Sequence, residues 1–489
     1  MKDNKYLPTI GLEIHAELKT ASKMFCSCKN DPDEERENAN VCSICLGHPG
    51  TLPVLNMEAI RHVLRVGISV DGTLADFTEW DRKNYYYPDI PKGYQISQYK
   101  YPLVSGGKLA GIEIERIHLE EDTAQSTHDT HEKSLVNFNR SGVPLMELVT
   151  KPVIHDAATA VRFARELQLL LRYLGAGEAN MEKGEMRVEA NISVAKIHEE
   201  GSKGSGESAK LGTKTEVKNL NSFKTVEKAI AYEIERQTSL LEAGEVVKQE
   251  TRGWDDVENE TYSQRSKESS HDYRYFPEPD IPKLKLSEIS EFGRSTLLET
   301  LPELPWQKRD RFIKGFGMTD KEVAVLIESP IIADYFDSIA GSFKGDAKKI
   351  KLATNYLLSD YLGVLKVRKL EFDPKQAIAS KTFAEMIGMI ADGLLSSRGA
   401  KDVILLLVDS PNESAKELAE RNGLIQKSDT SILIPAIEKI LADNQKVVEE
   451  YKGGKTASLQ FLIGQAMKAT KGAGNPEVVK QLFLERLKS

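Results

Sequence analysis

The sequence contains few cysteines and no long hydrophobic run. Only four of its 489 residues are cysteine. Its longest uninterrupted apolar run covers residues 403–408, whereas a membrane-spanning helix needs roughly 20 apolar residues. The first residues carry no apolar segment of the kind found in signal peptides. These absences argue against a disulfide-rich secreted domain and against a membrane protein, and they predict a cytoplasmic protein.

Familiar nucleotide-binding and hydrolase signatures are missing as well. The stretch 454–456 resembles the end of a P-loop, but Glu449 occupies the position of its first glycine. The sequence has neither a Rossmann fingerprint nor a nucleophile elbow. A nucleotide, if one is used, is therefore expected to be held by metal ions and carboxylates rather than by a glycine-rich loop.

The chain lacks an excess of basic charge. It has 66 Lys and Arg against 74 Asp and Glu, a formal net charge of −8, which argues against a whole-surface attraction to nucleic acid. Residues 451–489 differ, because they hold seven Lys or Arg and only two Glu. This local excess is compatible with contacts to a phosphate backbone and equally with a helical tail of solvated lysines.

The length and the change in pattern along the chain predict several domains. Strand patterns dominate the first part, and helical patterns take over beyond about residue 282. We expect a mixed α+β body over residues 1–293, a helical domain over 294–410 and a smaller helical domain over 411–489.

Several helices are expected from apolar periodicity and N-capping residues. In the body they cover residues 56–70, 156–174 and 222–241, and each starts at an Asn, Asp or Ser that can cap it. In the last domain they cover residues 432–451, 457–468 and 476–487.

The stretch 10–19 alternates strictly between apolar and polar residues, which predicts a strand with one buried face. The polar face then carries Glu13, His15 and Glu17. Any one such face is most simply an ordinary solvated surface. Further acids recur on or beside other expected strands of the same body, namely Glu120, Glu121, Asp122, Glu147 and Glu189. A sheet that brings them together would suit Mg²⁺, which prefers oxygen ligands.

Glu120 and Glu121 cannot both face this site if their strand is regular. Alternation after Ile117 and Leu119 puts Glu120 on the polar face and Glu121 inward. A β-bulge at the paired acids would reverse this arrangement, so the sequence leaves the choice open.

All four cysteines lie within twenty residues, as Cys26-x-Cys28 and Cys42-x-x-Cys45. Two close pairs joined by a short loop predict a tetrahedral Zn²⁺ site within an insertion at about residues 26–45. A disulfide is the alternative, but a reducing cytoplasm disfavours it. Since the four thiolates fill the coordination sphere, the expected role of zinc is structural.

Long motifs occur in order along the chain. They are IGLEIHAELKT at 10–20, CLGHPGTLPVLN at 45–56, DRKNYYYPDIPKGYQISQY at 81–99, HLEEDTAQSTH at 118–128, NRSGVPLMELVT at 139–150, EANMEKGEMRVEANIS at 178–193, EVKNLNSF at 216–223, HDYRYFPEPDIP at 271–282 and a tail at 464–487. Together with the four cysteines, these motifs resemble the B-subunit family of the glutamyl-/aspartyl-tRNA amidotransferases, and the resemblance covers essentially the whole chain.

The resemblance implies an ATP-dependent ligase. The side-chain carboxylate of glutamate on tRNA(Gln), or of aspartate on tRNA(Asn), is activated by ATP and then amidated by ammonia. The ammonia comes from an amidase A subunit, and a small C subunit completes a heterotrimer. The resemblance also implies a cradle-shaped body similar to glutamine synthetase, with helical and tail domains that bind the mischarged tRNA.

The resemblance further implies roles for residues of this chain. Mg²⁺ ligands and catalytic residues are Glu13, His15, Glu121 and Glu189, with Glu120 and Glu147 as additional candidate ligands. The family pattern more often has Asp at the position of Glu189, so this chain presents a longer side chain there. Expected phosphate contacts are Arg140, Lys214 and Lys218, and expected stacking residues for the acceptor end are Tyr85, Tyr87 and Tyr275. Many relatives lack the cysteines, in keeping with a structural zinc.

Two other functions fit parts of the pattern. A non-catalytic tRNA-binding scaffold would use the acidic faces structurally and show no dependence on ATP. A free-standing ligase of small amino acids could use the same metal site, but it would have little use for about two hundred residues of helical tail.

Overall fold

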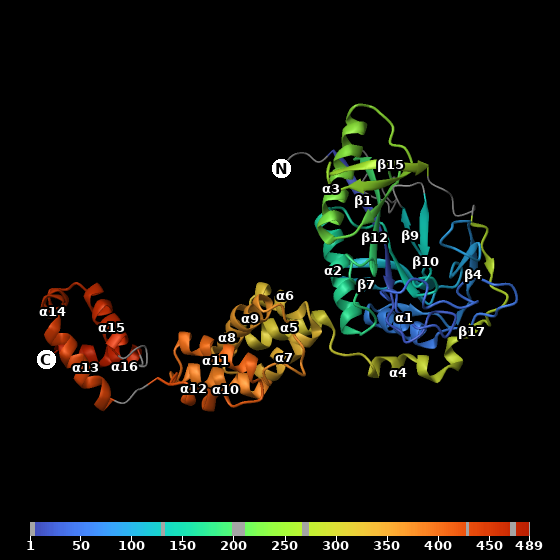
Figure 1. The fold of residues 1–489 in the computed structure, drawn as a ribbon. Coiled ribbons are helices and arrows are strands. Elements are labelled where there is room, and N and C mark those ends of the chain that lie inside the picture. The colour runs from blue at the N-terminus through green and yellow to red at the C-terminus, as the bar shows by residue number, and fades with distance from the viewer. Residues whose placement is uncertain are drawn as a thin grey trace. The chain divides into compact units, whose positions relative to one another are not determined.

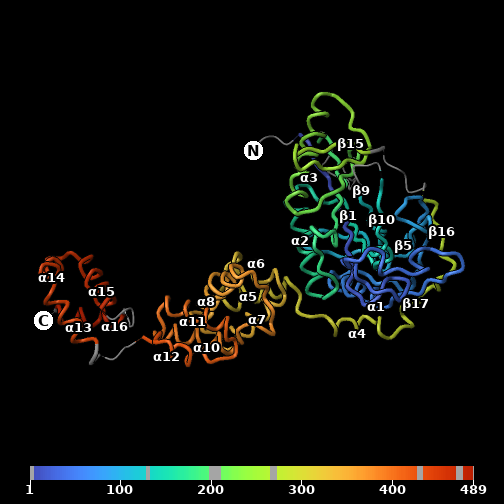
Figure 2. Tube along the Cα trace, in the orientation of Figure 1, coloured from blue at the N-terminus to red at the C-terminus, as the bar shows by residue number. Residues whose placement is uncertain are grey.

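The computed structural model describes residues 5–128, 133–197, 211–266, 273–426, 430–469 and 476–488. The chain forms two compact units, Met1–Pro305 and Trp306–Ser489, which Figures 1 and 2 show in blue to yellow and in yellow to red. The predicted division into three domains stays a prediction. None of the helices within the described ranges has the length and apolar character needed to cross a membrane.

A ten-stranded mixed sheet organises the first unit. Its strands run in the order β15-β14-β13-β12-β1-β11-β8-β6-β2, with β7 paired to β8, and β13–β14 is the parallel pair in an otherwise antiparallel arrangement. The bounds are β1 Tyr6–Glu17, β2 Thr73–Leu74, β6 Val104–Ser105, β7 Lys108–Leu109, β8 Ile112–Glu121, β11 Pro144–Thr150, β12 Met186–Lys196, β13 Thr215–Leu220, β14 Glu250–Asp255 and β15 Glu260–Ser266.

Small sheets accompany the large one. They are β9–β10, β16-β4-β5 and β17–β3. The bounds are β3 Phe77–Thr78, β4 Asp81–Asn84, β5 Tyr94–Ser97, β9 Gln125–His128, β10 Ser134–Asn137, β16 Phe276–Pro277 and β17 Leu284–Lys285. Gly142 lies in the turn between β10 and β11 and has a positive φ of +82°, which glycine adopts readily.

Strand β1 lies at the centre of the large sheet, and its alternation is confirmed. Ile10, Leu12 and Ile14 are completely buried, whereas the polar residues between them are only partly buried. Helices α1 (Met57–Ser69), α2 (Ala157–Tyr173) and α3 (Phe223–Glu242) pack against strands of this sheet, and Figure 1 shows α2 and α3 side by side along it. Because helices cover the apolar face of the sheet, the polar face of β1 is the one that remains available for a functional site.

The three expected helices of the body are confirmed together with their caps. The side chains of Asn56, Asp156 and Ser222 each accept a hydrogen bond from a backbone N–H in the first turn. These bonds satisfy donors that a helix end leaves without a partner, which is why the sequence pattern located the helix starts.

Replacing Asp156 with alanine is expected to lower the free energy of unfolding of the body by about 1 kcal/mol. Asp156 Oδ1 accepts a 2.7 Å bond from the Thr159 N–H, and this bond lowers the pKa of the carboxyl. The contribution of the charged form is therefore present above the ordinary pKa of aspartate and is lost as the pH falls through the lowered folded-state pKa. Urea unfolding of both proteins at pH 7 and at pH 3 measures the difference, which should shrink at the lower pH.

Helices α5 to α16 make up the second unit, after α4 (Arg294–Glu299) at the end of the first. Their bounds are α5 Pro305–Phe316, α6 Asp320–Ile327, α7 Pro330–Gly341, α8 Ala347–Asn355, α9 Leu362–Val367, α10 Ser380–Ala391, α11 Ser397–Asp409, α12 Ala415–Arg421, α13 Thr430–Asp443, α14 Gln445–Lys452, α15 Ala457–Ala469 and α16 Pro476–Lys488, with a π-helical turn at Tyr356–Tyr361. Helix α12 packs against α10 and α11, and the helices from α13 onward share an apolar cluster between Leu433 and Leu487.

The prediction of a single helix over residues 432–451 is wrong. The structure has two helices there, α13 and α14, because Asn444 leaves the helical conformation with φ −127° and ψ 41°. The Asn444 side chain donates a 2.8 Å hydrogen bond to the Ile440 carbonyl and so satisfies an acceptor at the end of α13. Apolar periodicity continues across this break, which is why the pattern alone did not reveal it.

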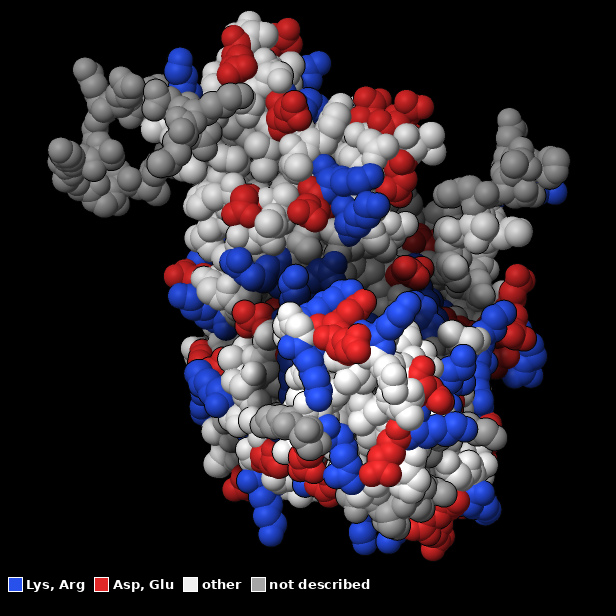
Figure 3. Space-filling model, turned by 90° about the vertical axis from the view of Figure 1, so that its left-hand side faces the viewer, with Lys and Arg blue, Asp and Glu red and all other residues white. Residues whose placement is uncertain are grey.

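Charges of both signs are interspersed on one face of the molecule. On the face drawn in Figure 3, lysine and arginine alternate with aspartate and glutamate, and neither sign covers the face as one patch. This distribution agrees with the small net charge of −8.

Candidate active site

Strand register brings four of the predicted acids, Glu13, Glu120, Glu147 and Glu189, to one face of the large sheet. Glu13 pairs with Glu189 of β12, and His15 pairs with Glu147 of β11. Glu147 in turn pairs with His118 of β8. Side chains at paired positions point to the same side of a sheet. We call this set the acid face; it consists of Glu13, His15, His118, Glu120, Glu147, Glu189 and Glu216.

Glu147 is the centre of the acid face. Its Oε2 lies 3.4 Å from His15 Nε2 and 3.3 Å from His118 Nε2. Glu120 lies beside them, 3.8 Å from both histidines, and its Oε2 accepts a 2.8 Å hydrogen bond from Ser97 Oγ. Glu120 and Glu147 are only 2% and 5% exposed, so these carboxylates are held in place inside the protein.

Attraction between the histidines and the buried carboxylates raises the pKa of the histidines and lowers the pKa of Glu147. Burial lowers the pKa of His15, but the hydrogen bond and charge of Glu147 and the charges of Glu13 and Glu189 outweigh it and raise the pKa to about 9. Burial also lowers the pKa of His118, but the charges and hydrogen bonds of Glu147 and Glu120 raise it to about 9. Burial raises the pKa of Glu147, yet the two histidines hold it well below its ordinary value. Burial and the charge of Glu147 raise the pKa of Glu13, and the nearby charge of His15 offsets this only in part.

The ligand atoms of the acid face fit divalent cations. Three groups each place their donor atoms within 4.8 Å of one another: Glu13 with His15 and Glu147, His118 with Glu120 and Glu147, and Glu13 with Glu189 and Glu216. The groups share Glu13 and Glu147, so they form one continuous row. Carboxylate oxygens with a few imidazole nitrogens are donors that suit Mg²⁺ or Mn²⁺.

Glu121 lies away from the acid face. The β8–β11 pairing is regular up to Glu121, so alternation holds and no bulge intervenes at these acids. The Glu121 carboxylate forms a 2.7 Å ion pair with Lys92 and accepts a 2.9 Å hydrogen bond from the Ile96 N–H. The structure therefore brings Glu120 together with the other predicted ligands and does not bring Glu121 there.

The expected phosphate contacts lie in different surroundings. Lys218 forms a 2.8 Å ion pair with Glu189, because a bulge at Asn219 (φ 62°) directs it toward the acid face. The Arg140 guanidinium donates to the carbonyls of Thr123 and Ala124 and lies 3.6 Å from Asp122. Lys214 is exposed just before β13.

Sequence reasoning missed five residues near the acid face, namely Lys83, Arg116, His118, Arg187 and Glu216. All but Arg116 lie inside the motifs given above. Arg187 alternates with Glu189 along one strand, so knowledge of the strand pairing was needed to find it. Arg187 lies opposite His15 and donates a 2.9 Å bond to Asp122.

Tyrosines from distant parts of the chain gather beside β4. Tyr85 contacts both Tyr87 and Tyr273, with ring centroids 6.0 and 5.8 Å apart, and Tyr275 stacks on Tyr99 at 4.4 Å. Asn84 holds the two segments together by donating to the carbonyls of Tyr273 and Arg274. His271 and Asp272, which precede Tyr273 in the same motif, lie outside the described residues.

The four cysteines fit a tetrahedral zinc site. The Sγ of Cys45 lies 3.4 Å from that of Cys26, 3.7 Å from that of Cys42 and 3.8 Å from that of Cys28. Zn–S bonds of about 2.3 Å at tetrahedral angles place sulfurs about 3.8 Å apart. All four are free thiols rather than disulfides.

A buried lysine adjoins the cysteines. Lys23 is completely buried, and its Nζ lies 3.8 Å from Cys45 Sγ and 3.2 Å from the Phe138 carbonyl oxygen. The hydrogen bond from Cys26 lowers the pKa of Cys45 to about 4, and the charge of Lys23 acts in the same direction. The thiolate needed by a metal is therefore favoured at this position.

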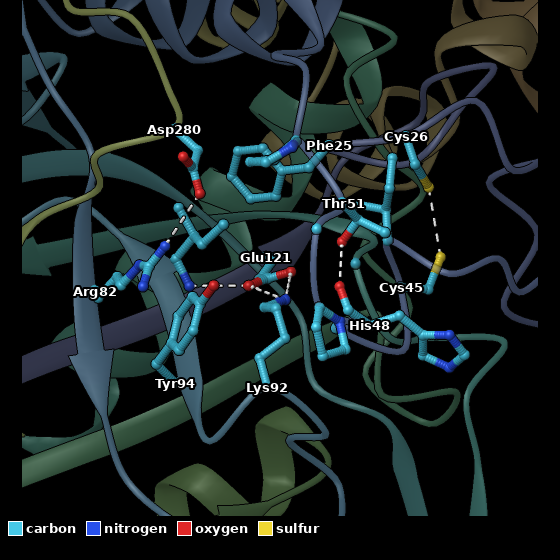
Figure 4. Close-up of a pocket in the computed structure, with 17 residues that line it drawn as sticks. Phe25, Cys26, Cys45, His48, Thr51, Arg82, Lys92, Tyr94, Glu121 and Asp280 are labelled. Atoms are coloured by element: carbon cyan, nitrogen blue, oxygen red, sulfur yellow. Dashed lines mark hydrogen bonds and ion pairs between the residues drawn. The ribbon is translucent and has the colours of Figure 1, made fainter.

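A cavity of about 200 Å³ separates the cysteine loop from the β4–β5 hairpin (Figure 4). Its walls include Cys26 and Cys45 on one side and Arg82, Lys92 and Glu121 on the other. In Figure 4 the Glu121–Lys92 pair forms part of the cavity wall and Arg82 points toward Asp280, 3.4 Å away.

The sheet and the acid face define a class of protein: an α+β enzyme fold that presents a row of candidate metal ligands. Comparison with known proteins specifies the family. The family described as the GatB/GatE catalytic domain matches residues 8–290, and the family described as the GatB domain matches residues 334–487. The chain belongs to the GatB family of amidotransferase subunits.

Relatives over the full length support this assignment, and each of them is named as the B subunit of an aspartyl/glutamyl-tRNA(Asn/Gln) amidotransferase. The chain is 39% identical to the relative from Thermoanaerobacter pseudethanolicus, 40% identical to that from Caldicellulosiruptor saccharolyticus and 41% identical to that from Moorella thermoacetica. Each comparison covers 99% of this chain and at least 99% of the relative. The resemblance found in the motifs is thereby confirmed.

Proposed function

We propose that this chain activates the side-chain carboxylate of a mischarged aminoacyl-tRNA, Glu-tRNA(Gln) or Asp-tRNA(Asn), and that the acid face is the site of this reaction. The observation that carries the proposal is the row of three ligand groups that share Glu13 and Glu147. The names of the relatives supply the substrate class, since they are amidotransferase subunits for these tRNAs.

Two bond exchanges make up the reaction. A carboxylate oxygen of the aminoacyl side chain attacks the γ-phosphorus of ATP, and ADP leaves. Ammonia then attacks the carbonyl carbon of the acyl phosphate, inorganic phosphate leaves, and the amide product loses a proton. The first exchange brings two anions together, so it needs fixed positive charge at the reacting groups.

Residues of the acid face would hold Mg²⁺, which would offset the charge of the ATP phosphates. We propose Glu13, His15, Glu120, Glu147 and Glu189 as its ligands, with His118 and Glu216 as additions from the geometry. Glu121 remains a prediction from the resemblance alone, and its ion pair with Lys92 points to a positioning role. Lys218 and Arg187 adjoin the same face and are suited to contact phosphate oxygens, as is Arg140 at its edge.

The other parts of the chain take supporting roles in this proposal. The cysteines would hold a structural Zn²⁺ that fixes the loop beside the cavity. The basic excess of residues 451–489 would contact tRNA. The amide step needs ammonia, so we propose a complex with an amidase A subunit and a small C subunit, in the cytoplasm.

Phosphate release from ATP tests this function. We expect the complex reconstituted with an amidase partner to release phosphate with Glu-tRNA(Gln) or Asp-tRNA(Asn), and only at background rate with the same tRNA uncharged. Equal release with charged and uncharged tRNA would contradict carboxylate activation. No release at all, together with intact tRNA binding, would leave the chain as a tRNA-binding scaffold.

A further inference from the structure

Lys83 lies on β4 near the acid face, with its ammonium group held between aromatic rings. Its Nζ lies 5.2 Å from the ring centroid of Tyr273 and 5.8 Å from that of Tyr85. β4 pairs with β5, and β5 packs against β8. Ser97 of β5 donates to Glu120 of the acid face, so this hairpin is fixed to the site by a hydrogen bond.

The other cations near the acids already have carboxylate partners. Lys218 pairs with Glu189 at 2.8 Å and Arg187 pairs with Asp122 at 2.9 Å. Arg116 lies 3.3 Å from Glu147. Lys83 differs from them, because among the described residues no carboxylate oxygen lies within 4.0 Å of its Nζ.

Glu120 and Glu147 favour the charged form of Lys83 while no metal ion is bound to them. Burial lowers its pKa, but the charges of Glu120 and Glu147 together with the tyrosines outweigh burial and raise the pKa well above its ordinary value. Glu120 and Glu147, which stabilise the protonated form of Lys83, are also candidate metal ligands, and a bound metal ion would neutralise their charge. The ammonium would then face aromatic rings alone, and a half-buried cation without a hydrogen-bonded counter-ion is costly.

We propose that Lys83 binds the side-chain carboxylate of the aminoacyl group, an inference that rests on the function proposed above. A single ammonium group matches the single charge of a carboxylate. The triphosphate carries several charges and is better matched by the row of metal ligands. Because Tyr85 and Tyr273 flank the ammonium group, a carboxylate bound to it takes a defined position for attack on phosphorus.

The same contact distinguishes substrate from product. The carboxylate of Glu-tRNA(Gln) is charged, whereas the amide of Gln-tRNA(Gln) is neutral and loses the attraction of Lys83. A hydrogen bond to a charged group makes a difference of about 10- to 100-fold in affinity. Lys83 is therefore a specificity residue that favours entry of the acid and release of the amide.

Binding of the two aminoacyl-tRNAs to the assembled complex tests the inference. The ratio of the Kd of Gln-tRNA(Gln) to that of Glu-tRNA(Gln) is measured by competition for wild type, Lys83→Met and Lys83→Gln. We expect both variants to reduce this ratio by about 10-fold or more through weaker binding of the substrate. The Kd of the product should stay unchanged, and the kcat of phosphate release should fall.

Lys100→Met is the matched control, because Lys100 is exposed and its Nζ lies 5.1 Å from the ring of Tyr101. This variant should keep the wild-type ratio. An unchanged ratio in a folded Lys83→Gln protein overturns the inference, and so does a raised KM for ATP as the only effect. Failure of the wild-type complex to release phosphate with mischarged tRNA contradicts the proposed function instead, whatever Lys83 does. If Lys83→Met does not fold, Lys83→Gln, which keeps two donors without the charge, decides the question.

Discussion

Replacement of Glu147 with glutamine is expected to lower tRNA-dependent phosphate release by about 10³-fold. Glu147 contributes to two of the three ligand groups and lies within 3.4 Å of both His15 and His118. The substitution keeps the shape but removes the charge, so both groups lose their shared anionic ligand. A loss of several kcal/mol of transition-state stabilisation corresponds to this factor.

Single-turnover phosphate release with saturating mischarged tRNA measures the effect of Glu147→Gln. Glu113→Gln is the matched control, because Glu113 is an exposed glutamate on the same strand β8 and pairs with Lys151 on the surface. The amidase partner should hydrolyse glutamine at its usual rate in both complexes. Phosphate release within a few-fold of wild type in a folded Glu147→Gln complex would show that the acid face is not the site of activation.

The second large effect concerns the cysteines. Purified wild-type chain is expected to contain about one zinc ion, and Cys45→Ser is expected to lose it, because structural zinc sites need all four ligands. Cys45 is buried at 4% exposure and contacts the other three sulfurs, so its loss disrupts the whole site. The melting temperature should fall by several degrees, since the loop from Cys26 to Cys45 loses its crosslink.

Metal analysis measures the zinc content and thermal unfolding measures the melting temperature. Substitutions of two lysines serve as comparisons. Lys23→Met removes the buried charge beside Cys45, so it should keep the zinc ion but weaken its retention against a chelator by about 10-fold. Lys29→Met should change neither property, because Lys29 is exposed and pairs with Asp31. Wild-type protein that purifies without zinc, or a Cys45→Ser protein with the zinc content and melting temperature of wild type, would contradict the assignment.

Much of the fold could be predicted where the physical cause is local. Alternation over residues 10–19 depends only on the period of a strand. The starts of α1, α2 and α3 depend on a side chain directly before each helix, which accepts a hydrogen bond from a backbone N–H two or three residues further on. The break at Asn444 was missed, since apolar periodicity on both sides continued through it.

The sequence by itself determined the chemistry available to this protein: acids and histidines on strands, paired cysteines, and motifs long enough to identify the GatB family. Only the tertiary structure decided which of these residues share a site. Strand register joins β1 to residues of β11 and β12 that are more than a hundred positions away. The register of β8 with β11 put Glu120 on the acid face and turned Glu121 toward Lys92. The position of Lys83 depends on packing of the β4–β5 hairpin against β8, and no spacing along the chain encodes that contact.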